Sequence, residues 1–209
     1  MSKLEELIAE LCPNGVEFVK LGDCCAIEDN KRKPIKASER TSGKTPYYGA
    51  NNIQDYVDGF THDGEYVLIA EDGSSSLENY SIQYVNGKFW ANNHVHVVKG
   101  NEGLNSRFLY HCLTAFNFVP YLVGGTRAKL NRASMIKIPI PLPPLLVQEE
   151  IVRILDNFTE LTAELTAELT AEIIARKKQS EYYRSEILRS SKLAETKTLG
   201  EVCNFVRGP

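Results

Sequence analysis

The chain has 209 residues, of which 43% are hydrophobic and 24% charged, as in ordinary globular proteins. It has no run of 18 apolar residues and no signal-peptide pattern at its N-terminus, so we expect a cytoplasmic protein without membrane contact. The net charge of −3 argues against a simple polyanion binder, and five cysteines without a CxxC pair support neither a zinc knuckle nor a dithiol redox site.

The first quarter of the chain alternates between short structured segments and polar loops. Leu4–Leu11 carries apolar residues at helical spacing and predicts an amphipathic helix, which Pro13-Asn14-Gly15 ends. Residues 16–27 predict one or two strands. Residues 29–45 are polar and basic and predict a loop, and residues 47–52 are expected to be rich in turns.

The middle of the chain predicts a sheet. Residues 56–60 and 65–70 favour strands, and the second of these is strongly apolar. Two further strands are predicted at 81–85 and 89–99. Asn86-Gly87, a dipeptide typical of tight hairpins, is expected to join them.

Helix and proline signals follow the sheet. Residues 106–116 predict a helix, Gly124-Gly125 a break, and residues 135–142 a short strand whose closing prolines exclude a helix. Residues 147–191 contain neither Pro nor Gly and predict one continuous helix, roughly 65–70 Å long. The predicted class is α+β: a compact domain at 1–146, then a long spacer and dimerisation helix at 147–192.

A four-residue repeat, Thr-Ala-Glu-Leu, dominates the long helix between Leu161 and Glu172. Four residues overshoot one helical turn by about 40°, so the leucine row winds slowly around the helix and departs from a strict heptad seam. An apolar row of this length is unfavourable in water, which favours pairing with another helix over a solitary exposed one. The residues expected to pair are Leu155, Phe158, Leu161, Leu165, Leu169 and Ile173.

A second repeat links the two ends of the chain. Val19–Cys25, with the sequence VKLGDCC, is similar to Lys197–Cys203, with the sequence KTLGEVC. The later copy follows directly after the long helix. We therefore predict that residues 193–209 form a stub of a second copy of the first domain.

No catalytic constellation is evident. His94 and His96 alternate along a predicted strand, as metal ligands can, but no Cys or carboxylate at a natural spacing completes a site, so a polar or hydrogen-bonded role is favoured. The G-x-S-x-G and P-loop frames are absent, as are the Asp-Pro-Pro-Tyr and Asn-Pro-Pro-Tyr boxes of adenine methylation. We predict no catalytic residue and no metal site.

Two polar loops have the composition of a DNA-contacting surface. Cations crowd residues 31–44 and could contact phosphates, although a solvated loop would have the same composition. Asparagines follow this loop, and residues 127–132 form a second basic loop; Asn can pair with adenine and Arg or Lys with guanine. The predicted DNA contacts are Lys31, Arg32, Lys33, Lys36, Lys44, Tyr48, Asn51, Asn52, Arg127, Lys129 and Asn131.

Several segments together resemble the specificity, or DNA-recognition, subunit of type I restriction–modification systems. The resemblance rests most on Ile138–Leu145 with Gln148–Asp156, on the Thr-Ala-Glu-Leu repeats and on Arg176–Arg184. Weaker matches are Lys20–Asp23, Tyr47–Asn51 and Phe89–His94. The similarity extends over nearly the whole chain, but a full member of the family has two recognition domains and two helices.

The resemblance implies a subunit without catalysis or cofactors of its own. Its partners would be double-stranded DNA, methyltransferase subunits that use S-adenosylmethionine, and restriction subunits that use ATP and magnesium. One domain and one helix imply a half-subunit whose dimer pairs two helices antiparallel and recognises a symmetric, two-part site. The alternative is a coiled-coil scaffold or adaptor that does not bind DNA, in which the prolines at 139–144 are a docking ligand instead of a stiff linker.

Overall fold

A computed structural model describes residues 2–124, 128–189 and 197–203 of the chain. The contacts among the residues divide the chain into a globular unit, Met1–Asn157, and a helical unit, Phe158–Pro209. The globular unit mixes helices and strands and the long helix α5 (Leu145–Arg189) follows, so the predicted α+β class is confirmed. α5 begins two residues before the predicted boundary at 147.

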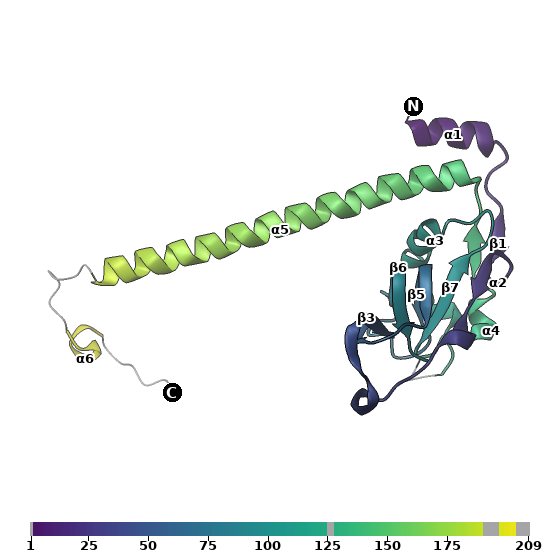
Figure 1. Cartoon of the computed structure of the whole chain (residues 1–209). Coiled ribbons are helices and arrows are strands. Elements are labelled where there is room, and N and C mark those ends of the chain that lie inside the picture. Colours follow the sequence, from purple (N-terminus) through teal and green to yellow (C-terminus); the bar gives the residue numbers. More distant parts are fainter. Residues whose placement is uncertain (1, 125–127, 190–196, 204–209) are drawn as a thin grey trace, which may run out of the picture. The chain divides into compact units, whose positions relative to one another are not determined.

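The globular unit contains short helices before and after a run of five consecutive strands, β3 to β7 (Figure 1). The helices, with three short 3-10 turns, are α1 (Lys3–Leu11), α2 (Leu21–Cys24), η1 (Asp29–Lys31), η2 (Ala37–Glu39), α3 (Ser106–Thr114), η3 (Val119–Tyr121), α4 (Arg132–Met135) and the start of α5. The strands are β1 (Phe18–Lys20), β2 (Cys25–Ile27), β3 (Ser42–Gly49), β4 (Asn52–Val57), β5 (His62–Ala70), β6 (Ile82–Ala91), β7 (Val95–Gly100) and β8 (Pro139–Pro141).

Six strands form one mixed sheet in the order β2-β7-β5-β6-β3-β4. Neighbours are antiparallel except for β3 and β6, which are parallel. Along β5, Val67 and Ile69 enter one hydrophobic cluster, and Tyr66 and Leu68 enter a second. Because successive side chains point to opposite faces, both faces of β5 are covered, and this explains its continuous apolar run. α3 packs against β5, β6 and β7 (Figure 1).

The hairpin predicted at Asn86-Gly87 is wrong, because β6 runs through both residues. Gly87 lies opposite Gly64 in the β5–β6 ladder, and both glycines have positive φ, +99° and +129°. Pairing with a distant strand therefore overrides the local turn signal. A turn follows β6 instead, where the backbone N–H of His94 donates to the Asn92 side chain at 2.8 Å, and β7, which like β6 is antiparallel to β5, begins at Val95. The single strand predicted at 89–99 is thus two strands.

The segment at 47–52, predicted to be rich in turns, is largely strand. β3 continues to Gly49 and β4 begins at Asn52, so only a tight connection separates them. Tyr47 is 1% exposed and its hydroxyl accepts a hydrogen bond from the Ile35 N–H, so its ring is part of the buried core. Asn52 takes a left-handed backbone conformation, with φ of 121°. The predicted loop at 29–45 contains η1, η2 and the start of β3.

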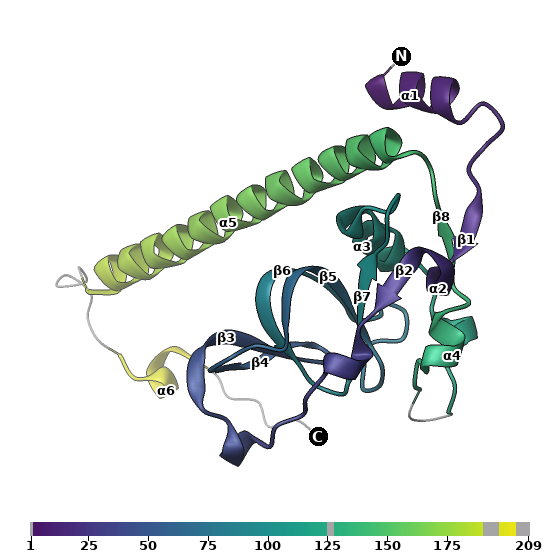
Figure 2. The ribbon, with the colours of Figure 1, turned by 45° about the vertical axis from the view of Figure 1, so that its right-hand side comes forward.

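The first and last strands of the globular unit pair with each other. β1 and β8 form an antiparallel two-stranded sheet and lie side by side in Figure 2. The helical turn α2 separates β1 from β2, so the strand region predicted at 16–27 is interrupted. The run predicted as strand at 135–142 narrows to the three residues of β8, because α4 precedes it.

Buried polar contacts fix the start of α5 within the globular unit. Gln148 is 0% exposed; its Nε2 donates to the carbonyls of Gly103 and Pro143, and its Oε1 accepts from the Asn105 N–H. Two helical turns later, Asp156 pairs with Arg107 at 2.7 Å and with His111 at 2.8 Å. These contacts join the first turns of α5 to α3.

Glu150 lies beside them and makes ion pairs with two exposed cations from a buried side chain. Its carboxylate, 3% exposed, lies 2.6 Å from Arg153 and 2.8 Å from Lys3. Hydrogen bonds from Arg153 and then Lys3 lower the pKa of Glu150 from 4.5 to about 2. The carboxylate therefore stabilises the fold above pH 4.5, and this contribution is lost as the pH falls from about 4.5 towards 2.

We expect Glu150→Gln to make the free energy of unfolding less dependent on pH in that window. Urea unfolding at a series of pH values measures the slope for the wild type and the variant. Glu149→Gln is the matched control, because Glu149 is the exposed neighbour and has no ion pair among the described residues. An unchanged slope in Glu150→Gln would contradict the assignment.

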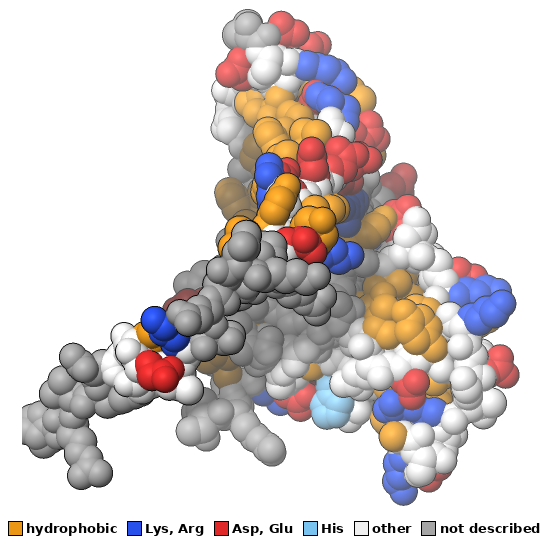
Figure 3. Space-filling view, turned by 90° about the vertical axis from the view of Figure 1, so that its left-hand side faces the viewer, with side chains coloured by type: hydrophobic (Ala, Val, Ile, Leu, Met, Phe, Trp, Pro, Cys, Tyr) orange, Lys and Arg blue, Asp and Glu red, His pale blue; other side chains and the backbone are white. Residues whose placement is uncertain are grey.

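The helical unit exposes an apolar row along α5. Phe158, Leu161, Leu165, Leu169 and Ile173 are 54–64% exposed in the single chain. Hydrophobic side chains also reach the surface in several places on the face drawn in Figure 3. No helix among the described residues combines the length and apolarity needed to cross a membrane.

The threonines of the repeat satisfy their hydroxyls within the helix. Thr162, Thr166 and Thr170 each donate from Oγ1 to the carbonyl four residues earlier, at 2.7 Å. Since these hydroxyls are bonded to the backbone, the threonine side chains do not need a polar partner outside the helix. An apolar surface could therefore cover the leucine row and the threonine row beside it.

The second repeat has matching local geometry in its two copies. α2 and α6 (Leu199–Val202) are both single turns that start with Leu-Gly, and each is followed by a cysteine whose N–H donates to that leucine carbonyl. The backbone angles of Cys25 (−128°, 143°) and Cys203 (−129°, 133°) nearly coincide. The prediction that a second copy of the domain starts here stays a prediction, because residues 204–209 lie outside the described part.

Candidate nucleic-acid interface

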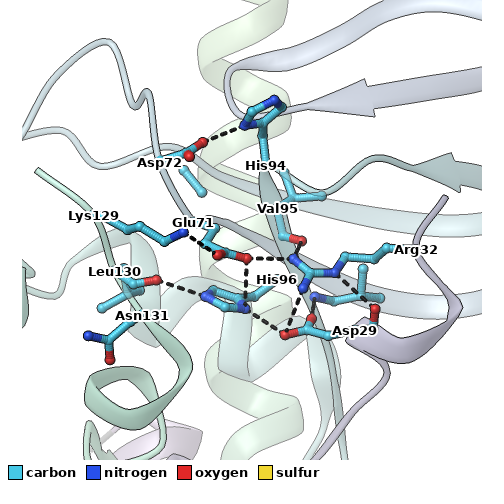
Figure 4. Close-up of polar contacts among 12 residues, drawn as sticks. Asp29, Arg32, Glu71, Asp72, His94, Val95, His96, Lys129, Leu130 and Asn131 are labelled. Carbon is cyan, nitrogen blue, oxygen red and sulfur yellow. Dashed lines mark hydrogen bonds and ion pairs between the residues drawn. The ribbon is translucent and has the colours of Figure 1, made fainter. Parts of the chain in front are cut away.

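A cluster of charged side chains joins four segments of the globular unit (Figure 4). Glu71, just after β5, accepts from Arg32 at 2.7 Å and from Lys129 at 2.7 Å. Arg32 also donates to the Val95 carbonyl and lies 3.6 Å from Asp29. We call Asp29, Arg32, Glu71, His96 and Lys129 the charge cluster. It connects η1, the end of β5, β7 and the segment 128–131.

His96 is the buried centre of the charge cluster. It is 1% exposed, and its Nδ1 lies 2.7 Å from Asp29 Oδ2 while its Nε2 lies 2.8 Å from the Leu130 carbonyl oxygen. A carboxylate and a carbonyl only accept hydrogen bonds, so both ring nitrogens of His96 face acceptors. Figure 4 shows His96 between Asp29 and Leu130.

The charges of the cluster lower the pKa values of its two acids. Burial by itself would raise the pKa of Asp29, but the hydrogen bond and charge of His96 outweigh it and lower that pKa. Burial also opposes ionisation of Glu71, and hydrogen bonds from Lys129 and Arg32 outweigh it and lower its pKa. Glu71 in turn raises the pKa of Lys129. The two acids are therefore ionised at neutral pH, and the contacts of Glu71 with Lys129 and of His96 with Leu130 hold the segment 128–131 in place.

A pocket of about 690 Å³ lies next to the cluster, and Asn51, Gln54, Asp72, His94 and Lys129 are among its lining residues. His94 Nδ1 contacts Asp72 Oδ1 at 2.5 Å, which orients the imidazole. Asn92 donates to Gln54 Oε1 at 3.4 Å. Among the described residues, His94 Nε2 and Gln54 Nε2 have no partner. They are the groups that could bond a ligand in this pocket.

Asn51 supports the wall of this pocket. Its amide donates to the Gly73 carbonyl at 2.7 Å and accepts from the Ser75 N–H at 2.8 Å. Both ends of the amide are therefore used to hold the loop after β5. We assign Asn51 to shaping the pocket, although it was predicted to contact DNA.

Of the predicted DNA contacts that the structure describes, two, Asn51 and Lys129, come together in the pocket. Arg32 is largely buried in the charge cluster, and Tyr48 is 9% exposed and packs edge-on against Phe89. Burial raises the pKa of Tyr48. Asn131 accepts from the Ser134 N–H and so caps α4. These three side chains have structural partners that the sequence did not reveal.

The remaining predicted contacts within the described residues are exposed. Lys31 pairs with Glu28 at 2.6 Å and Lys36 with Glu39 at 3.7 Å, so part of the basic loop is neutralised internally. Lys33 lies over the Trp90 ring, 6.0 Å from its centroid. Lys44 and Asn52 are also exposed. Arg127 lies outside the described residues, and its predicted role in base recognition stays a prediction.

Gln54 and Asp72 carry no sequence signal for a site, and the sequence pattern around His94 predicts no DNA role. The available signal was the alternation of His94 and His96, which suggested ligands on one face. The two histidines instead belong to different contacts, with Asp72 and Asp29. No group of three or more His, Cys, Asp or Glu among the described residues could hold a metal ion.

The residues predicted for dimerisation all lie on α5. Leu155 is 37% exposed within the globular unit, and the other five, Phe158, Leu161, Leu165, Leu169 and Ile173, form the exposed row of the helical unit. The structure holds a single chain, so their pairing stays a prediction.

Comparisons with known proteins agree on one family. The type I restriction modification DNA specificity domain matches residues 13–175. A protein of Haemophilus influenzae, named as a type I restriction enzyme specificity subunit, is 62% identical over 191 residues, which cover 90% of this chain and 50% of that protein. The EcoR124I/EcoR124II specificity subunit of Escherichia coli is 32% identical, and the match covers 100% of this chain and 52% of that subunit.

Solved structures show the same fold. The S subunit of a type I restriction–modification system from M. genitalium superposes with a TM-score of 0.65 at 18% identity, covering 84% of this chain and 47% of that one. The HsdS subunit of Thermoanaerobacter tengcongensis gives a TM-score of 0.53 at 18% identity, covering 78% and 44%. The chain thus spans about half the length of the relatives that it matches.

Proposed function

The chain belongs to the type I restriction–modification DNA specificity family, and from this premise we propose that its globular unit recognises one half of a split DNA site. The family match over residues 13–175 carries the proposal. The chain supplies no catalytic group and binds no cofactor in this proposal. Methyltransferase subunits with S-adenosylmethionine, and restriction subunits with ATP and magnesium, perform the chemistry on the site that it selects.

The polar pocket is the proposed place of base recognition. His94 Nε2 and Gln54 Nε2 are hydrogen-bonding groups without partners among the described residues, and Lys129 brings a cation to the same pocket. Amide and cationic side chains are the common donors to base edges in the major groove. Fixed partners behind them, Asp72 for His94 and Glu71 for Lys129, restrict their orientations and so favour selective binding.

A gel-shift experiment with a pool of random duplexes tests DNA recognition. The chain is mixed with the pool with and without a cognate methyltransferase subunit, and retained duplexes are sequenced. Enrichment of one sequence supports the proposal. The alternative, a coiled-coil scaffold that does not bind DNA, predicts no retention in either lane.

We further propose that two chains pair their α5 helices antiparallel and present two globular units to a symmetric site. The exposed row from Phe158 to Ile173 supports this pairing, because a monomer would leave it in water. An isologous dimer of this kind has the same recognition surface on each side, so its site would be an inverted repeat.

The double variant Leu165→Asp, Leu169→Asp is expected to be a monomer. Four leucines leave the interface of the dimer, two from each chain, and burial of each contributes at least about 1.5 kcal/mol, so the Kd of the dimer should rise by roughly 10⁴-fold. Sedimentation equilibrium measures the change. The control, Glu164→Asp with Glu168→Asp, keeps the apolar row and should remain a dimer. A wild-type chain that is monomeric at micromolar concentration would rule out the pairing.

A further inference from the structure

Three cations surround a second hollow of the globular unit. Lys20, Arg132 and Lys137 line an open pocket of about 450 Å³, and one carboxylate, Asp23, lines it with them. All three cationic side chains belong to exposed residues. Within the described residues, none of the three has an ion pair or a side-chain hydrogen bond. The hollow therefore has an excess of positive charge that the protein itself does not neutralise.

Backbone pairing brings these cations together from distant parts of the sequence. Lys20 ends β1 and lies opposite Pro139 of β8, which follows Lys137 by two residues. The N–H groups of Leu21 and Gly22 donate to the carbonyls of Ile138 and Ile136, at 2.8 and 3.0 Å. A Cβ on Gly22 would come within 2.8 Å of the Ile136 side chain, so glycine permits this close approach. Backbone hydrogen bonds between α2 and residues 136–138 therefore hold Lys20 and Lys137 near each other.

Most cations of the basic loop at 31–44 are instead paired with carboxylates, and within the described residues Lys33 and Lys44 are the ones without an ion pair. Lys31, Arg32, Lys36 and Arg40 each pair with a carboxylate of the same unit. Cations that are already paired gain less from a phosphate, since the existing ion pair must be weakened or shared. The hollow, with three unpaired cations and one acid, is the better anion site.

The hollow and the polar pocket are joined by one short segment. Lys129 lines the pocket and Arg132 lines the hollow, so the two residues are at most about 10 Å apart along the chain. That distance equals the rise of about three base pairs. A DNA strand with a base edge at the polar pocket could therefore place a nearby phosphate at the hollow.

We propose that Lys20, Arg132 and Lys137 form a binding site for backbone phosphates of the recognised DNA. The inference rests on the proposed function and adds residues to it. Phosphate contacts fix the position of a protein on the duplex but do not distinguish sequences. The site therefore strengthens binding to every duplex and aligns the polar pocket with the bases.

The salt dependence of DNA binding tests this site. Fluorescence anisotropy of labelled duplexes, cognate and unrelated, is measured with the full chain over a series of salt concentrations. The triple variant Lys20→Ala, Arg132→Ala, Lys137→Ala should reduce the slope of log K against log salt by about 2–3 on both duplexes. The control, Lys31→Ala with Lys36→Ala, removes two exposed but paired cations and should change the slope by less than 1. Thermal unfolding checks that both variants remain folded.

The outcomes separate the site from the wider proposal. If the wild-type chain and the triple variant bind DNA with the same slope of log K against log salt, the phosphate site is overturned and DNA recognition is left intact. A chain that binds no duplex, with or without the methyltransferase subunit, would overturn both. Saturable binding of inorganic phosphate to the wild-type chain, measured by calorimetry and lost in the triple variant while the salt slope of DNA binding stays unchanged, would identify a site for small anions and overturn the assignment to DNA.

Discussion

Replacing Arg32 by methionine is expected to destabilise the globular unit by about 3–5 kcal/mol, the cost of removing one partner from a buried ion pair. The substitution removes the donors to Glu71 and to the Val95 carbonyl. It leaves Glu71 with Lys129 and leaves Asp29 with His96, so the acids lose part of the charge that holds them ionised in the interior. Urea unfolding followed by circular dichroism measures the change.

The neighbouring residue supplies the control. Lys31→Met also removes a paired cation, but its side chain is 51% exposed, so the loss should be below about 1 kcal/mol. The comparison distinguishes two roles for the basic loop. If both variants lost equally little unfolding free energy, Arg32 would be a surface cation available to DNA, as its sequence context predicts.

Deleting one Thr-Ala-Glu-Leu repeat, Thr166–Leu169, is expected to abolish modification of the original DNA site by the reconstituted complex. Four residues account for about 6 Å of helix, close to the rise of two base pairs. In the proposed dimer both helices become shorter, so the two half-sites should be recognised only when they are about two base pairs closer together. Sequencing of methylated plasmids identifies the new site.

The half-site sequences should not change, because the deletion lies outside the globular unit. Thr166→Ala is the matched control: it removes the hydroxyl that donates to the Thr162 carbonyl but keeps the length of the helix, so the original gap should be retained. A deletion variant that still modifies the original site would show that α5 does not set the gap.

The helices and the apolar strands could be predicted from the sequence because their signals are local. Helical spacing in Leu4–Leu11 predicted α1, and the apolar run at 65–70 predicted β5. The absence of Pro and Gly predicted α5 almost to its first residue. The turn predicted at Asn86-Gly87 does not form, because these residues pair with Glu65 and Gly64 of β5. That pairing with a strand distant in the sequence keeps them extended.

The candidate site was far less predictable. The basic loop suggested phosphate contacts, but the carboxylates that neutralise Arg32 and Arg40, Glu71 and Asp55, come from other strands. Gln54 and Asp72 carry no motif, and they acquire a role only because the ends of β4, β5 and β6 lie around one pocket. Lys20 and Lys137 lie far apart in the sequence and meet only because β1 pairs with β8.

By itself, the sequence determined the α+β class, the long repeat helix and its exposed apolar row, and the family to which the chain belongs, since periodicity and motif are properties of consecutive residues. The tertiary structure decided which cations are paired and which are available, that His96 is a buried link and not a metal ligand, and which side chains share a pocket. Those outcomes depend on long-range strand pairing, because pairing sets the distances between charges and hence the strength of their interactions.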